Sequence, residues 1–182
     1  MTTDVELRER IARLEARSEI FDCIQRYARG MDRRDRQLLR SAYHDDAVDD
    51  HIGFVGPVED FIDWAFAYHS MQTRYQHYLL NHTAEVSGEE AHAETYYLFV
   101  GTDREPADHM TLSGGRYVDR LERRDGRWAI VDRVCVAEWM TESTTQISDE
   151  VLAMLTDIKG AAHDQSDPSY TRPLTATRVG AG

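Results

Sequence analysis

The stretch that decides the fold reads GGRYVDRLERRDGRW and covers residues 114–128. Tyr117 and Leu121 stand an even number of positions apart, so they share one face if the segment is a β-strand. The pair Asp125-Gly126 readily supplies the positive φ angles that a tight hairpin turn requires. The stretch therefore predicts two adjacent antiparallel strands joined by a short turn.

A period of two residues continues on both sides of this hairpin. Polar and apolar side chains alternate, which is typical of strands with one buried face. The alternating segments are separated by connections that contain glycine or proline. The predicted strands are residues 74–86, 91–101, 109–123 and 128–139.

The chain before these strands has the period of a helix instead. Helices followed by strands favour an α+β fold, in which helices cover one face of an antiparallel sheet. We expect Gly30 to end the first helix and either Asp32 or Asp35 to cap the second. The predicted helices are residues 5–29, a short segment ending near residue 43, and residues 58–71, with a polar-edged strand at 45–54.

Composition and charge narrow the possible partners. The chain has 182 residues, of which 41% are hydrophobic, and a net charge of -12. That size suits one domain with a substantial core, and the negative charge disfavours nucleic acid and anionic membranes as partners. We expect a neutral or weakly charged small molecule. Cys23 and Cys135 stand in unlike segments and form no metal or redox motif, which favours a reducing cytoplasm.

No segment has the pattern of a signal peptide or a membrane helix. The first residues lack an apolar core, and no apolar run reaches the roughly 20 residues that span a bilayer. We therefore expect a soluble, cytoplasmic protein whose domain covers residues 1–140. Residues 141–182 add a short helix over 148–160 and a polar tail, which is part of the same domain, wraps a partner or is disordered.

Tyr27 and Asp32 flank the expected helix stop in the segment YARGMD. On an uninterrupted helix, five positions separate two side chains by about 140°, whereas a break at Gly30 lets both face one cavity. A tyrosine hydroxyl can donate to a developing oxyanion, and a carboxylate can abstract a proton or orient an imidazole. A helix cap at Asp32 and a core position for Tyr27 remain the alternative.

His77 and Asn81 lie in the segment RYQHYLLNH. In a regular strand they share one face, whereas His82 points to the other. His77 is a candidate base, because imidazole titrates near neutral pH and a buried carboxylate orients it well. Asn81 is a candidate hydrogen-bond donor beside it. The alternatives are a structural histidine bonded to the backbone, and a strand in which His82 faces the pocket in place of His77.

The segment HDDAVDDH at residues 44–51 is dense in side chains that bind metals. In an extended segment, His44 and His51 stand about 23 Å apart, which is too far to share one ion. We therefore expect no metal site. Asp49, Asp50 or His51 can line the mouth of a pocket, and a solvated strand edge is the alternative.

Arg133 interrupts an otherwise apolar strand face between Val131 and Cys135. A buried guanidinium needs a carboxylate partner or a ligand anion, and we expect a structural ion pair. The chain has no G-x-S-x-G elbow, no phosphate-binding glycine loop and no H-E-x-x-H motif. Their absence disfavours serine hydrolases, nucleotide enzymes and zinc proteases.

Together these elements resemble the SnoaL-like branch of the nuclear transport factor 2-like superfamily, over roughly residues 5–140. The shared order is a long helix, Y-x-x-x-x-D, a short helix, D-D-A-V, an aromatic helix, an H-x-x-x-N strand and an R-R-D-G-R-W hairpin. The Y-x-x-x-x-D element is similar to that of bile acid 7α-dehydratase. The G-M-D-R, Q-H-Y and E-R-R-D-G-x-W elements are similar to those of scytalone dehydratase and hexachlorocyclohexane dehydrochlorinase.

The resemblance implies a cone-shaped, curved antiparallel sheet with three N-terminal helices around one hydrophobic pocket. It also implies a lyase that eliminates water or HCl without a cofactor, from an apolar, oxygenated ring or a polyketide- or steroid-like molecule. On this chain His77 takes the role of general base, Asp32 that of its orienting carboxylate, and Tyr27 that of a pocket hydroxyl. The expected substrate contacts are Asn81, Asp50, His51, Tyr97 and Trp64.

Two other functions remain open under the same resemblance. Ketosteroid isomerases share the superfamily and place a proton-shuttling aspartate on the D-D-A-V-x-D strand, near Asp50. Other relatives bind small molecules or assemble complexes without catalysis. Relatives of this fold usually pair through the outer face of the sheet, so we expect a homodimer or homotrimer to which the chain after residue 140 contributes.

Overall fold

The computed structural model describes residues 3–144, 148, 150, 151, 153, 154 and 162–175. The predicted helices and the four predicted strands are confirmed within these residues, with modest shifts at their ends. In chain order the elements are α1 (Asp4–Asp32), α2 (Arg36–Arg40), β1 (Tyr43–His51), β2 (Phe54–Pro57), α3 (Val58–Ser70), β3 (Gln72–Ser87), β4 (Glu90–Asp103), β5 (His109–Arg124), β6 (Arg127–Thr144) and the short 3-10 helix η1 (Pro168–Tyr170).

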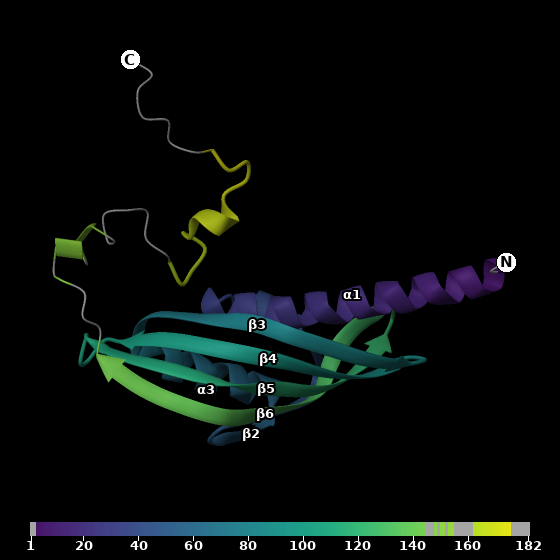
Figure 1. Ribbon diagram of the computed structural model, residues 1–182, viewed down its shortest axis with the longest axis horizontal. Coiled ribbons are helices and arrows are strands. Elements are labelled where there is room, and N and C mark those ends of the chain that lie inside the picture. The colour runs from purple at the N-terminus through teal and green to yellow at the C-terminus, as the bar shows by residue number, and fades with distance from the viewer. Residues whose placement is uncertain (1–2, 145–147, 149, 152, 155–161, 176–182) are drawn as a thin grey trace, which may run out of the picture.

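In the described part of the chain, the strands form one six-stranded sheet in the order β2-β1-β6-β5-β4-β3. Its pairings are antiparallel except that β1 and β6 run parallel, so the sheet is mixed. The β5–β6 hairpin turns at Asp125 and Gly126, whose φ angles are 53° and 77°. The sheet is curved, and α1 lies along it (Figure 1). The expected α+β cone is therefore confirmed, but the expectation of a wholly antiparallel sheet is wrong, because β1 pairs with β6 in parallel.

The first helix does not end at Gly30, as the sequence pattern suggests, but continues to Asp32. Gly30 serves the contact between α1 and α2 instead, because a Cβ atom there would lie only 2.4 Å from the backbone nitrogen of Leu39. Asp35 is the N-cap of α2, and its side chain accepts a hydrogen bond from the backbone N–H of Leu38 at 3.0 Å. Asp32 is thereby left for another partner.

Only the second half of α1 packs in the core. Ile20, Cys23 and Ile24 are fully buried there, whereas Val5 and Leu14 are 66% and 68% exposed. The N-terminal end of the helix extends past the end of the sheet (Figure 1). The apolar side chains along α1 therefore lie in two environments: those of the second half pack in the core, and those of the first half are exposed to solvent.

A β-bulge in β3 changes which of its side chains face inwards. Between Leu79 and His82, two residues of β3 stand opposite a single residue of β4. The alternation therefore shifts by one position, so that His82 is half-buried and Asn81 is exposed. The expectation that Asn81 shares the inner face with His77 is wrong.

The expected ion pair of Arg133 is confirmed. Its Nε and Nη2 atoms donate to the carboxylate of Asp119 at 2.6 and 2.8 Å, and both side chains are 0% exposed. The guanidinium carbon lies 4.0 Å from the ring centre of Tyr27 and 4.3 Å from that of Tyr117. The guanidinium therefore lies between two aromatic rings of the core and holds them in place.

Several predictions concern parts or states that this single chain does not test. The helix expected over residues 148–160 lies largely outside the described residues, as do residues 176–182 of the tail. Oligomerisation and cytoplasmic location stay predictions. Among the described residues, no helix combines the length and the apolar character needed to cross a bilayer.

Candidate active site

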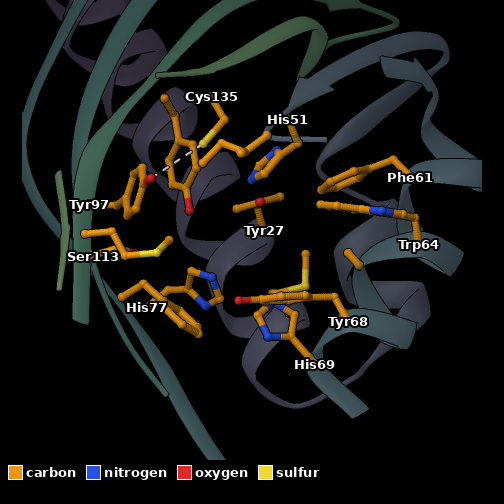
Figure 2. A pocket seen from close by; sticks show the side chains of 16 residues that line it. Tyr27, His51, Phe61, Trp64, Tyr68, His69, His77, Tyr97, Ser113 and Cys135 are labelled. Carbon is orange, nitrogen blue, oxygen red and sulfur yellow. Dashed lines mark hydrogen bonds between the residues drawn. The ribbon is translucent and has the colours of Figure 1, made fainter. Parts of the chain in front are cut away.

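The helices and the concave face of the sheet surround a cavity of about 240 Å³. Polar groups enter it at few points, among them His51, His69 and His77 (Figure 2). Walls of this kind suit a largely apolar ligand that is oriented by a few hydrogen bonds. The aromatic side chains of the wall are Tyr27, Phe61, Trp64, Tyr68, Tyr97, Phe99 and Tyr117.

His77 reaches this cavity from β3, with Asp32 behind its ring. Its Nδ1 atom lies 2.7 Å from Oδ1 of Asp32, and its backbone N–H donates to the same carboxylate at 3.1 and 3.2 Å. A carboxylate at Nδ1 keeps the proton of a neutral imidazole there, which leaves the lone pair on Nε2. The two side chains are 8% and 15% exposed. The structure thus brings together the two residues that the sequence analysis pairs as base and orienting carboxylate.

Tyr27 and Asp32 do not point in the same direction, because α1 continues past Gly30. Tyr27 lines the cavity, whereas Asp32 lies at a surface groove between α1 and β3 and meets the cavity only through His77. The Tyr27 hydroxyl is buried and has no hydrogen-bond partner within the described residues. Burial raises the pKa of Tyr27 well above its usual value, although Arg133 opposes this. The hydroxyl therefore stays protonated and can donate to a ligand oxygen.

A second pair of a carboxylate and an imidazole lies on β1. Strand alternation turns Asp49 and His51 inwards and Asp50 outwards. Nδ1 of His51 lies 2.8 Å from Oδ1 of Asp49, and Oδ2 of Asp49 accepts a hydrogen bond from the Tyr43 hydroxyl at 2.6 Å. His51 lines the cavity as expected. Asp50 does not, because it lies at a shallow surface depression outside it.

Two other predicted contacts, Trp64 and Tyr97, line the cavity. The Tyr97 hydroxyl accepts a weak hydrogen bond from the sulfur of Cys135 at 3.7 Å (Figure 2). Tyr97 also stacks on Tyr117, with ring centres 4.7 Å apart. These contacts fix the wall of the cavity on the side of β4, β5 and β6.

His69 at the end of α3 is a cavity residue that sequence reasoning missed. Its Nδ1 atom lies 2.8 Å from Oε1 of Gln72, and its ring centre lies 5.4 Å from that of His77. Burial, and to a lesser extent the neighbouring His77, lowers the pKa of His69 to about 3. His69 is therefore neutral at physiological pH. Its place at the end of the aromatic helix, just before β3, was the available signal.

Part of the C-terminal tail also packs against the site. His163 donates from Nδ1 to the backbone oxygen of Asp32 at 2.6 Å, and the Tyr170 hydroxyl donates to Asp35 at 2.8 Å. These contacts hold the end of α1 and the N-cap of α2 from outside. No sequence pattern indicates them, because residues 162–175 are polar and lack a helical or strand period.

In the part of the chain that the structure describes, no cluster of three or more His, Cys, Asp or Glu side chains is arranged to hold a metal ion. His82, which lies inwards after the bulge, bonds the hydroxyl of Thr95 through Nδ1 at 2.8 Å. It packs against Phe21 and does not line the cavity. His77 is therefore the histidine of β3 that faces the cavity.

Comparison with known proteins identifies the family. The model of the SnoaL-like domain matches residues 12–134, a span that includes both carboxylate–imidazole pairs. The chain belongs to the SnoaL-like domain family. Among curated protein sequences, none matches this SnoaL-like chain.

Solved structures resemble this SnoaL-like chain over most of its length. The hexachlorocyclohexane dehydrochlorinase LinA-type3 of Novosphingobium barchaimii LL02 is 25% identical, with a TM-score of 0.68 over 75% of this chain and 95% of that chain. A type 2 LinA hexachlorocyclohexane dehydrochlorinase is 27% identical, with a TM-score of 0.67 over 75% and 94%. A presumed scytalone dehydratase of Novosphingobium aromaticivorans DSM 12444 is 16% identical, with a TM-score of 0.65 over 75% and 93%, and shows the shared fold alone.

Proposed function

We propose that this SnoaL-like protein is a cofactor-independent lyase of the dehydratase type, acting on an apolar, oxygenated ring compound. The observation that carries the proposal is the Asp32–His77 pair, with 2.7 Å between Oδ1 and Nδ1, at the wall of a largely aromatic cavity. The dehydrochlorinases among its structural relatives, at 25% and 27% identity, support elimination as the class of reaction.

In the proposed reaction, Nε2 of His77 removes a proton from a carbon next to a carbonyl group. The electron pair of the broken C–H bond forms a double bond as the leaving group departs. Asp32 stabilises the imidazolium that results, because its carboxylate lies 2.7 Å from the ring and is only 15% exposed, so water weakens the attraction less than in bulk solvent. Tyr27 donates to the carbonyl oxygen, on which negative charge develops.

The test begins with a thermal-shift screen of cyclic hydroxyketones, chlorinated rings and steroids, followed by mass spectrometry of each stabilising compound after incubation. The expected product has lost water or HCl and gained a double bond. For such a compound, His77→Ala should lower turnover by roughly 10²- to 10⁴-fold. The matched control is His92→Ala, since His92 is 67% exposed on β4, and it should keep full turnover.

Other products would contradict this proposal in distinct ways. A product of unchanged mass with a shifted double bond would assign an isomerase. Ligands that raise the melting temperature and always return unchanged would assign a binding module. Full turnover in His77→Ala would show that the base lies elsewhere.

A further inference from the structure

His51 and His77 stand on opposite sides of the cavity, although their strands lie far apart in the sheet. β1 is the second strand and β3 the last in the order β2-β1-β6-β5-β4-β3, and the curvature of the sheet brings both histidines to one cavity. Figure 2 shows them on either side of Tyr27. In each ring, Nδ1 lies within hydrogen-bond distance of a carboxylate oxygen, 2.8 Å from Asp49 for His51 and 2.7 Å from Asp32 for His77. One elimination needs only one such base, so the second pair requires its own explanation.

The surroundings of His51 keep its ring protonated. Asp49 is 0% exposed, so its negative charge meets no water and acts on the nearest donors. Burial lowers the pKa of His51, but Asp49 and the sulfur of Cys135 raise it more, to about 9. Tyr27 on α1, Tyr117 on β5 and the neutral His69 on α3 face the same cavity. Behind Asp49 lie the Tyr43 hydroxyl, which donates to it, and the Arg133 guanidinium, which contacts the rings of Tyr27, Tyr43 and Tyr117 and is paired with Asp119. At neutral pH His51 is therefore an imidazolium that can give up a proton.

We propose that His51 is the general acid of this cavity and protonates the oxygen atom that leaves the substrate, while His77 removes the proton from carbon. The inference rests on the proposed elimination and narrows its substrates to rings whose leaving group is a hydroxyl or an ether oxygen. A halide departs as a stable anion without a proton, whereas hydroxide or an alkoxide departs readily only when it is protonated as it leaves. Asp49 is the positioning residue of this acid.

The proton and electron balance of the step closes without a co-reactant. Nε2 of His77 takes the proton from carbon, and the C–H electron pair becomes the new double bond. The C–O bond breaks, its electron pair goes to oxygen, and the His51 imidazolium supplies the proton that makes water or an alcohol. His77 is then protonated and His51 neutral, and exchange with solvent after product release restores both.

The first test measures the protonation state of His51 by nitrogen NMR, on protein labelled at histidine. Wild-type His51 should carry protons on both ring nitrogens at pH 8 and lose one near pH 9. Asp49→Asn should move this loss to lower pH, because the amide cannot stabilise the imidazolium. The matched control Asp50→Asn, at the neighbouring exposed carboxylate, should leave it unchanged. A His51 ring with one proton at pH 8 would overturn the proposal.

The second test uses 4-nitrophenol, a ring compound whose neutral and anionic forms absorb at different wavelengths. An imidazolium at the cavity should bind the anion, which resembles a departing oxygen, and shift the ionisation of the bound phenol to lower pH. His51→Gln should weaken binding of the anion roughly tenfold to a hundredfold, the worth of a charged hydrogen bond. His77→Ala should keep the anion signal. Equal binding by wild type and His51→Gln, or no binding by either, would refute the assignment.

Turnover separates this inference from the proposed function on which it rests. Two ring substrates are compared, both with an ether oxygen as the leaving group: one releases an alkoxide and the other releases 4-nitrophenolate. His51→Gln should slow elimination more for the alkoxide, because 4-nitrophenolate leaves without being protonated. If His77→Ala abolishes turnover and His51→Gln slows elimination of both leaving groups equally, the proposed lyase activity is supported and the assignment of His51 as general acid is wrong. If His51 is protonated and binds 4-nitrophenolate but no compound is eliminated, the lyase is wrong and His51 remains an anion-binding group.

Discussion

The two carboxylate–imidazole pairs of the cavity have similar geometry but are built from the chain in different ways. Asp32 and His77 are 45 positions apart and meet because the end of α1 packs against β3. Asp49 and His51 are two positions apart on one strand, so strand alternation alone places both on the inner face. The first pair depends on tertiary packing, and the second on local backbone geometry.

The environments of the two pairs differ as well. Asp32 is 15% exposed and lies beside a surface groove, whereas Asp49 is 0% exposed and bonded to Tyr43. The carboxylate of the β1 pair is therefore the drier of the two and acts more strongly on its imidazole, although the His51 side chain itself is 16% exposed and that of His77 8%. The same two residue types can in this way serve as a base on one wall and an acid on the other.

The largest expected effect comes from breaking the pair between α1 and β3. Asp32→Asn keeps the size of the side chain but removes the charge that stabilises a protonated His77, so turnover should fall roughly 10²- to 10⁴-fold. Steady-state kinetics with a substrate from the screen would measure it. Asp22→Asn is the control, because Asp22 is an exposed carboxylate on the same helix. Similar kinetics for the two variants would contradict the role of Asp32.

The next largest effect concerns the pair on β1 and the stability of the fold. The pKa of His51 is raised from 6.5 to about 9 in the folded protein, so the folded state holds a proton that the unfolded state releases. This stabilisation is complete below about pH 6.5 and is lost as the pH rises through about 9. The free energy of unfolding should therefore fall across this range, by an amount on the order of 3 kcal/mol.

Urea unfolding of wild type and His51→Gln at several pH values would measure this effect. The difference between the two proteins separates His51 from the thiol of Cys23, whose pKa burial raises to about 11. The variant should show a flatter dependence between pH 6.5 and 9. Parallel curves would show that folded His51 holds no additional proton.

A smaller effect is expected from the tail residue that holds Asp32. His163 donates to the backbone oxygen of Asp32, and its ring stacks on Tyr75 with centres 4.2 Å apart. His163→Ala should cost about 1–2 kcal/mol of unfolding free energy. It should lower turnover several-fold, through a less well-positioned Asp32, and leave the titration of His51 unchanged. An unchanged melting temperature and unchanged kinetics would show that His163 neither stabilises the fold nor positions Asp32.

Sequence alone predicted much of this molecule, and the reasons are local. Alternation over four segments predicted β3 to β6, and Asp125-Gly126 predicted their last turn. The pairing of Asp32 with His77 came from the resemblance to SnoaL-like enzymes. On β1 the two-residue spacing of Asp49 and His51 already requires a common face, so their pairing follows from strand alternation alone.

Other features could not be read from the chain, because they depend on contacts between distant segments. The bulge that exposes Asn81 exists only in the register between β3 and β4. Gly30 is needed because Leu39 of the next helix approaches its backbone. The packing of His163 on Tyr75 joins residues that are far apart in sequence and follow no period.

The smallest effects are expected at the two predicted contacts that the structure places outside the cavity. Asp50→Asn and Asn81→Ala each change an exposed side chain, so the free energy of unfolding should change by no more than about 0.5 kcal/mol. Turnover should stay near that of wild type, because Asp50 points away from both histidines and Asn81 lies beyond the bulge. Asp50→Asn is the sharper of the two, since a ketosteroid isomerase-like mechanism would use a carboxylate near this position to move the proton. If Asp50→Asn abolishes turnover while Asp32→Asn leaves it near wild type, the proton moves on the outer side of β1 and the assignment of base and acid to His77 and His51 fails.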